Sequence, residues 1–137
     1  VKVKRYRMKS SESRRFSEKQ AEKQPLLAPI LKGKEQLEVI ELKSEKGEER
    51  IYLIRGEPVL VQLSSGEIIP FIEAVEKFDL RMPRVVVDLG AVPHIARGAD
   101  VMGPGIVSVE GEFEEGDLVV VVDEKAKSII AVGRAKR

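Results

Sequence analysis

Two side chains in the second half of the sequence are spaced for joint chemistry, His94 and Arg97. Residues three apart share a helical face, so both are expected to point the same way. His94 is the only histidine and the chain has no cysteine. No pairing of nucleophile and base and no metal-ligand spacing is visible. The protein is therefore predicted not to be an enzyme and to use no cofactor or metal, and a surface histidine without a role is the plainer alternative for His94.

A bend rich in glycine follows at Met102-Gly103-Pro104-Gly105. Glycine adopts backbone conformations closed to other residues and lets a second molecule approach the main chain closely. The backbone N–H groups of such a bend are suited to meet phosphates. The alternative is that these glycines serve turn geometry alone.

The charge of the chain is distributed unevenly, although its sum is only +1. Residues 1–34 contain eleven Lys or Arg against three Glu, a net charge of +8, whereas residues 35–83 have a net charge of −5 and residues 84–137 of −2. Basic residues are interleaved with apolar residues from Val1 to Lys9, which would suit a strand with a charged face. These cations indicate either contact with nucleic acid or a solvated edge strand that is protected from aggregation.

The elements that position these residues follow from the apolar pattern. Residues 10–24 are polar apart from Phe16 and Ala21, which predicts an exposed helix or a mobile loop. Pro25 and Pro29 bracket an apolar cluster. Because proline disfavours helix in the residue before it, this cluster is expected to be an irregular anchor on the core.

Short β-branched runs separated by Gly, Ser and Pro predict an antiparallel meander after residue 35. Its strands are expected at Leu37–Leu42, Ile51–Ile54 and Val59–Leu63. The spacing of Phe71, Ile72, Val75 and Phe78 predicts a short helix that covers the meander. Residues 1–82 are therefore predicted to form a small α+β domain with a basic arm.

Residues 83–137 have the pattern of a small β-barrel, with many short strands and one brief helix. The apolar run Val85–Val87 predicts a strand covered on both faces. Asp88 is placed to cap a short helix over Ala91–Arg97, which Gly98 would end. Further strands are expected at Ile106–Val109, Leu118–Val122 and Ser128–Val132.

Five motifs in this half resemble the PUA domain, named after pseudouridine synthase and archaeosine transglycosylase. They are Gly90-Ala91, Gly98-Ala99-Asp100-Val101-Met102, Pro104-Gly105-Ile106, Glu115-Gly116-Asp117-Leu118-Val119 and Ala131-Val132-Gly133-Arg134. Residues 38–78 are similar to the domain that precedes PUA in the translation-associated family of the malignant T-cell-amplified sequence proteins, ligatin and archaeal relatives. The resemblance implies an all-β, RNA-binding pseudobarrel that follows the α+β domain.

In the PUA family, the Gly-Ala helix, the strand after it and the Pro-Gly loop line the RNA groove. The resemblance therefore implies these RNA-binding residues, with the last on a flanking strand: Gly90, Ala91, His94, Arg97, Gly98, Ala99, Asp100, Val101, Met102, Pro104, Gly105 and Arg134. The family usually closes its barrel with a strand after the segment that matches Gly133-Arg134. Either the N-terminal strand fills that place, or the closing strand is absent from this chain.

The expected function is non-catalytic RNA binding in translation, with transfer RNA or ribosomal RNA held by shape and phosphate contacts. The expected partners are structured RNA and the ribosome or translation factors, with no membrane and no DNA. Two alternatives remain. One is an adaptor that docks a protein on the ribosome through the acidic meander, and the other is a detached RNA-binding subunit of a modification enzyme.

The sequence lacks Asn, Thr and Trp and has only four Gln. Loss of thermolabile amides with gain of charge is typical of heat-adapted proteins, and chance bias in a short chain is the alternative. The longest aliphatic run, Leu118–Val122, is far too short to cross a bilayer. No apolar stretch follows the basic N-terminus, so a cytoplasmic location is predicted.

Overall fold

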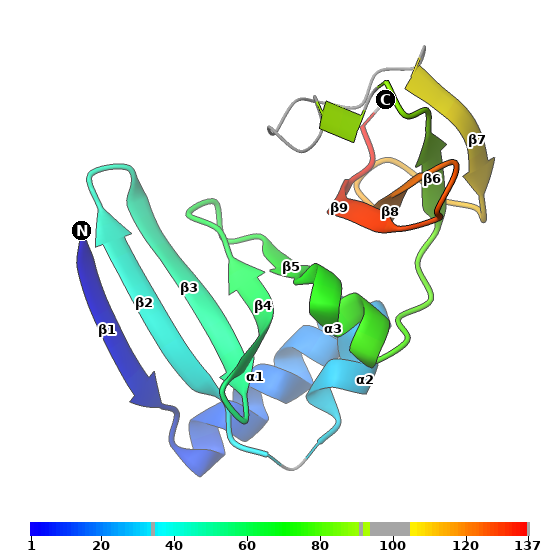
Figure 1. Ribbon diagram of the computed structural model, residues 1–137. Coiled ribbons are helices and arrows are strands. Elements are labelled where there is room, and N and C mark those ends of the chain that lie inside the picture. The colour runs from blue at the N-terminus through cyan, green and yellow to red at the C-terminus, as the bar shows by residue number, and fades with distance from the viewer. Residues whose placement is uncertain (34, 91, 94–104, 137) are drawn as a thin grey trace. The chain divides into compact units, whose positions relative to one another are not determined.

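The computed structural model describes residues 1–33, 35–90, 92–93 and 105–136. The chain divides into two compact units, Val1–Leu80 and Arg81–Arg137, and each contains its own sheet (Figure 1). The boundary predicted from the sequence, after residue 82, lies two residues further along. No helix within the described ranges is long and apolar enough to span a membrane.

The first unit is built on a five-stranded antiparallel sheet in the order β1-β2-β3-β4-β5. Its strands are β1 (Lys2–Arg7), β2 (Glu38–Ser44), β3 (Gly47–Ile54), β4 (Glu57–Gln62) and β5 (Ile68–Pro70). A two-residue turn joins β3 to β4, and its residues Arg55 and Gly56 both have positive φ, 52° and 79°, as a tight hairpin requires. The predicted meander is confirmed, and β5 is a strand that the sequence pattern did not predict.

The N-terminal strand forms one edge of this sheet. β1 runs antiparallel to β2, with Lys4 opposite Glu41 and Tyr6 opposite Val39. These pairs match charge with charge and ring with aliphatic side chain, which stabilises the pairing. β1 therefore belongs to the sheet of the first unit, and the alternative that it also fills the closing place in the barrel stays a prediction.

The polar stretch after β1 is a helix, α1 (Ser10–Lys23). It contacts the sheet through single residues rather than an apolar stripe. Oγ of Ser13, a buried residue, accepts a hydrogen bond of 3.1 Å from the backbone N–H of Leu37. The ring of Phe16 stacks on Tyr52 of β3 with 4.4 Å between centroids. Of the two structures predicted for this stretch, the helix is correct and the mobile loop is wrong.

The two-proline segment that follows is helical, which corrects the irregular anchor predicted from the sequence. It forms a 3₁₀ helix at Pro25–Leu27 and then α2 (Ala28–Leu31). Both prolines lie in the first turn of a helix, where the missing N–H costs nothing. The anchoring itself is confirmed, because Leu27 and Ile30 are 0% and 2% exposed. The predicted covering helix is also present, as α3 (Ile72–Lys77).

The second unit contains a four-stranded sheet in the order β7-β6-β8-β9. The strands are β6 (Arg84–Val87), β7 (Ile106–Glu110), β8 (Leu118–Asp123) and β9 (Ile129–Arg134). β6 pairs antiparallel with β7 and parallel with β8. Because β6 and β8 are the two inner strands, both have continuous apolar runs with buried side chains. The four strands predicted for this half are confirmed.

The turn from β8 to β9 is organised by one carboxylate. The side chain of Asp123 accepts hydrogen bonds from the backbone N–H groups of Lys125, Ala126 and Ser128, at 3.0, 2.6 and 3.1 Å. These bonds, chiefly the one from Ala126, hold the pKa of Asp123 below its usual range. The ionised carboxylate is thus part of the folded structure.

Replacing Asp123 by Ala is expected to lower the melting temperature at neutral pH and to flatten its pH dependence. Because the folded pKa is depressed, the contribution of Asp123 is complete above the unfolded pKa of about 3.9. It is lost as pH falls through the lower folded value. Thermal unfolding from pH 2 to 7 measures both effects. Glu124→Ala, at the exposed neighbouring residue, is the control, and an equal loss in both variants would contradict this role.

Candidate nucleic-acid interface

Two of the predicted RNA-binding glycines, Gly90 and Gly105, lie at the same end of the second sheet. β6 ends at Val87, which pairs with Ile106 at the start of β7. The backbone N–H of Asp88 then donates to the carbonyl of Gly105 at 3.1 Å. A Cβ atom on Gly90 would lie 3.2 Å from Oδ1 of Asp88, closer than an ordinary contact. A larger residue at 90 would therefore crowd the side-chain carboxylate of Asp88.

Most of the predicted groove falls outside the described residues. This holds for the helix expected over Ala91–Arg97, of which only residues 92 and 93 are described. It also holds for nine predicted site residues: Ala91, His94, Arg97, Gly98, Ala99, Asp100, Val101, Met102 and Pro104. Their part in RNA binding stays a prediction from the resemblance.

Arg134 lies, by register, at the other end of the sheet from these glycines. It pairs with Leu118, the first residue of β8. β8 runs parallel to β6 and Val87 is opposite Asp123, the last residue of β8. Nη1 of Arg134 also donates to the carbonyl of Gly116 at 2.9 Å, across the turn before β8. The pairing therefore does not bring Arg134 beside Gly90 and Gly105, and its guanidinium supports a turn.

A second set of predicted contacts, the basic N-terminal segment, lies on the first unit. In the row across β1, β2 and β3, Lys4 is opposite Glu41 and Glu41 is opposite Arg50. The hydroxyl of Tyr6 donates to Glu41, and this bond is the main reason why the pKa of Glu41 is lowered. The ammonium of Lys4 also lies over the ring of Tyr6. These charges are balanced within the sheet.

Other cations of the same segment are not balanced in this way. Within residues 1–33, Lys2, Arg7 and Lys9 are exposed and form no ion pair with a described residue. Lys2 even lies opposite Lys43 of β2, and like charges in direct opposition destabilise a sheet. An anionic partner would relieve this repulsion, and the three side chains are the candidate phosphate contacts of the N-terminal segment.

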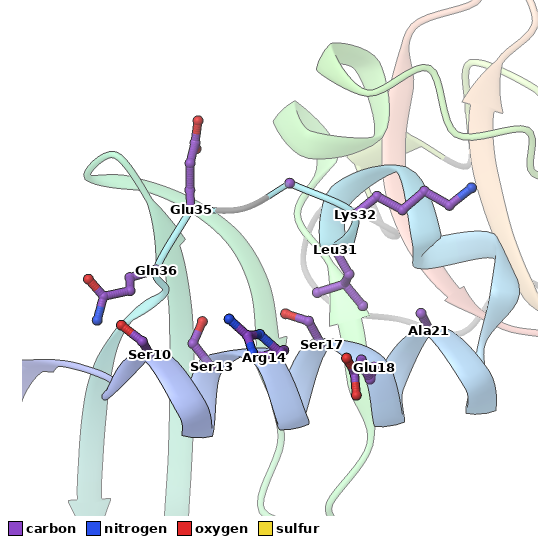
Figure 2. A pocket seen from close by; sticks show the side chains of 11 residues that line it. Ser10, Ser13, Arg14, Ser17, Glu18, Ala21, Leu31, Lys32, Glu35 and Gln36 are labelled. Atoms are coloured by element: carbon purple, nitrogen blue, oxygen red, sulfur yellow. The ribbon is translucent and has the colours of Figure 1, made fainter.

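A pocket of about 670 Å³ lies between α1 and the segment from Leu31 to Gln36, and we call it the α1 pocket. Ser10, Ser13, Arg14 and Ser17 project from α1 toward that segment (Figure 2). The sequence pattern did not predict these residues as a site. The net charge of residues 1–34 was the only signal for them, because a pocket forms only when the chain folds back over the helix.

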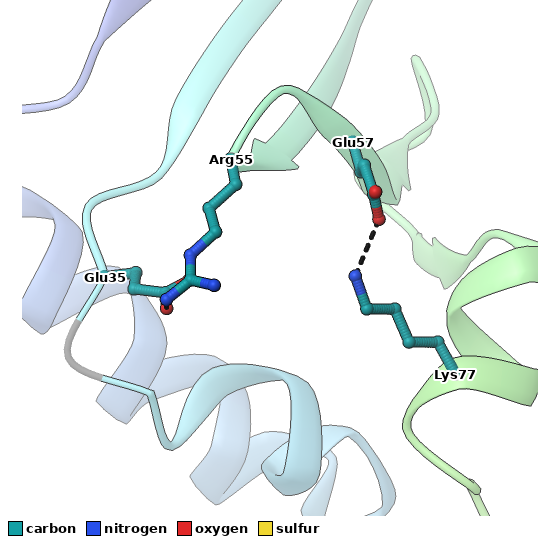
Figure 3. Close-up of polar contacts among 4 residues, drawn as sticks. All are labelled: Glu35, Arg55, Glu57 and Lys77. Carbon is teal, nitrogen blue, oxygen red and sulfur yellow. Dashed lines mark hydrogen bonds and ion pairs between the residues drawn. The ribbon is translucent and has the colours of Figure 1, made fainter.

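Two exposed ion pairs lie elsewhere on this unit (Figure 3). Nη2 of Arg55 contacts the carboxylate of Glu35, and Nζ of Lys77 lies 2.7 Å from Oε2 of Glu57. The lysine lowers the pKa of Glu57. Pairs this exposed contribute about 0–1 kcal/mol to stability, but they engage cations that would otherwise attract RNA.

Comparison with known proteins places this geometry among PUA domains. The family model of the PUA domain matches residues 83–136. The crystal structure of a PUA domain from Aeropyrum pernix K1, a tartrate complex, superposes with a TM-score of 0.76 at 29% identity, over 98% of this chain and 73% of that chain. The predicted fold class is therefore confirmed: a small α+β domain followed by a PUA-type pseudobarrel.

The chain is also similar to proteins known from their sequences. An uncharacterized protein of Methanocaldococcus jannaschii is 40% identical over 85 residues, which cover 62% of this chain and 52% of that protein. Translation machinery-associated protein 20 of Schizosaccharomyces pombe is 32% identical over 139 residues, which cover 94% of this chain and 74% of that protein. The fungal match extends across both units.

Proposed function

This chain belongs to the family of PUA-domain proteins that includes translation machinery-associated protein 20, and on that basis we propose that it binds structured RNA in translation. The observation that carries the proposal is the fungal match, which covers 94% of this chain. The RNA would be transfer RNA or ribosomal RNA, bound through the PUA domain. The ribosome or a translation factor would be the protein partner.

The proposed mechanism divides the work between the two units. The PUA unit would hold RNA by shape, with the glycine-rich segment from Gly90 to Gly105 offering backbone N–H groups to phosphates. Residues 84–137 have a net charge of −2, so this unit is not a general polyanion binder. Three exposed cations of the N-terminal segment, Lys2, Arg7 and Lys9, would supply the long-range attraction.

A non-catalytic role is part of the proposal. Among the described residues, no group of three or more His, Cys, Asp or Glu is placed to hold a metal ion. That binding needs neither a metal nor a cofactor stays a prediction. A cytoplasmic location stays a prediction.

Binding of transfer RNA at two salt concentrations tests this function. We expect binding at low salt that weakens as salt rises, with a slope of log affinity against log salt of about −0.7 to −0.9 for each phosphate contact. A protein without affinity for transfer RNA or ribosomal RNA at low salt would contradict the proposal.

The adaptor function remains a second candidate because of a groove between β4 and α3. The groove has a volume of about 520 Å³, and Val59, Phe71 and Phe78 are among its apolar lining residues. Glu57, Glu73 and Lys77 also line it. Lys77 engages Glu57, which leaves the carboxylate of Glu73 for a basic residue beside an apolar anchor. Recovery of a specific protein partner after nuclease treatment, and its loss in a Phe71→Ser variant that remains folded, would favour this function.

A further inference from the structure

The α1 pocket presents hydrogen-bonding groups that nothing in the described structure engages. Oγ of Ser13 is already occupied by the N–H of Leu37. The hydroxyls of Ser10 and Ser17, in contrast, make no hydrogen bond with any described residue. Arg14 lies between them on the same side of α1 (Figure 2) and forms no ion pair there. One guanidinium and two hydroxyls therefore face a common space.

The charge of the rim favours an anion. Arg14 and Lys32 are its cations, and Glu18 and Glu35 its carboxylates. Glu35 is engaged by Arg55 and points away from α1 (Figures 2 and 3). Two cations thus remain against one carboxylate, within the segment of residues 1–34 whose net charge is +8. Guanidinium groups bind phosphate through paired, directional hydrogen bonds.

The apolar lining residues of the pocket suit an organic group that is bound beside the anion. Ala21 and Leu31 supply apolar surface. A smaller cavity of about 120 Å³ shares Ser17 and Leu31 with the pocket and adds Ile30 and Leu37. A volume of about 670 Å³ lies within the usual range for small-ligand sites, roughly 300–1,000 Å³. The site is therefore larger than a bare phosphate needs.

We propose that the α1 pocket is a second RNA-binding site, which takes the phosphate and ribose of one unpaired nucleotide. Arg14 binds the phosphate, with Lys32 at the rim. Ser10 and Ser17 bind ribose hydroxyls, and the ring of the sugar or base lies against Leu31. Single-stranded RNA is recognised through such splayed-out nucleotides. The inference rests on the proposed RNA-binding function and adds a site outside the PUA domain.

The test compares neighbouring substitutions on α1, with fluorescence anisotropy of a short single-stranded RNA as the readout. Arg14→Gln removes the pocket cation, and Arg15→Gln removes an exposed cation that does not line the pocket. Ala21→Leu fills the pocket without a change of charge, and Ser11→Leu is its exposed control. We expect Arg14→Gln to weaken binding roughly tenfold, as loss of a charge-assisted hydrogen bond does, and Ala21→Leu to weaken it as well, because the added side chain occupies the space of the nucleotide. The two controls are expected to weaken binding by less than about twofold.

The possible results of this test distinguish a failure of the α1 pocket proposal from a failure of the proposed RNA-binding function, on which it rests. Equal losses in Arg14→Gln and Arg15→Gln, with wild-type affinity in Ala21→Leu, would overturn the pocket and leave a general basic surface. A wild-type protein that binds neither this RNA nor transfer RNA would overturn the proposed function itself. Melting temperatures of all four variants show that a loss of binding is not a loss of folding. Crosslinking of RNA containing 4-thiouridine to the peptide of residues 10–36 is expected to be lost in Ala21→Leu and kept in Ser11→Leu, and an equal yield in both would contradict the pocket.

Discussion

Replacing Val87 by Asp is expected to unfold the second unit and to abolish the RNA binding that depends on it. Val87 is 0% exposed and belongs to a core cluster with Val85, Val119 and Val121. A carboxylate among these valines would be desolvated, at a cost of several kcal/mol, or would have to take up a proton. A unit of this size has only roughly 3–8 kcal/mol of stability to lose.

The first unit is expected to stay folded in this variant. Both tyrosines of the chain, Tyr6 and Tyr52, belong to that unit, so their near-ultraviolet circular dichroism reports on it alone. Far-ultraviolet dichroism should at the same time lose part of its strand signal. Retention of the tyrosine signal with loss of transfer RNA binding would assign that binding to the second unit.

Val107→Asp is the matched control for this substitution. Val107 lies on the neighbouring strand β7 and is 54% exposed. The same change of side chain should there alter the free energy of unfolding by less than about 1 kcal/mol. A Val87→Asp protein that melts like the wild type, or one that also loses its tyrosine signal, would contradict the assignment of separate cores.

Neutralising the unpaired cations of the N-terminal segment is expected to weaken RNA binding at least roughly tenfold at low salt. The variant combines Lys2→Gln, Arg7→Gln and Lys9→Gln, at side chains that form no ion pair with described residues. If each contacts one phosphate, the slope of log affinity against log salt should become less steep by about 2 to 3. A salt titration of transfer RNA binding measures both quantities.

A second triple variant distinguishes position from net charge. It combines Arg5→Gln, Arg55→Gln and Lys77→Gln, which remove the same charge from the same unit. Each of these side chains is in an ion pair, with Glu38, Glu35 and Glu57 respectively. We expect a loss of less than about threefold. If both triple variants lose affinity equally, the RNA affinity depends on total charge, and the prediction that Lys2, Arg7 and Lys9 contact phosphates is wrong.

The strands could be predicted because their signals are local. Val85–Val87 and Leu118–Val122 are continuous β-branched or aliphatic runs, and turn residues limit them on both sides. The helix at Ile72–Lys77 had apolar residues at helical spacing. The strand Ile68–Pro70 was missed because it is only three residues long and ends in proline, so propensity carries little weight there.

The candidate site, too, could be predicted from the sequence in part, and the rest depends on the tertiary structure. The glycines of the PUA motifs could be recognised because residue type and spacing are visible in the sequence alone. Which glycines lie together depends on the pairing of β6 with β7, and that pairing joins residues 19 to 26 positions apart. The register of β8 and β9 likewise places Arg134 at the other end of the sheet from Gly105.

The sequence by itself determined the family, the β-rich second unit and the concentration of basic charge in residues 1–34. Each of these three features follows from residue types and from the spacing of residues that are close together in the sequence. Only the tertiary structure decided that β1 pairs with β2, that Phe16 stacks on Tyr52, and that Arg14 faces a pocket while Arg15 does not. The physical reason is that strand pairing and pockets arise from contacts between segments that are distant in the sequence. Which segments come together depends on the total burial and hydrogen bonding of the fold, and the local sequence pattern does not determine it.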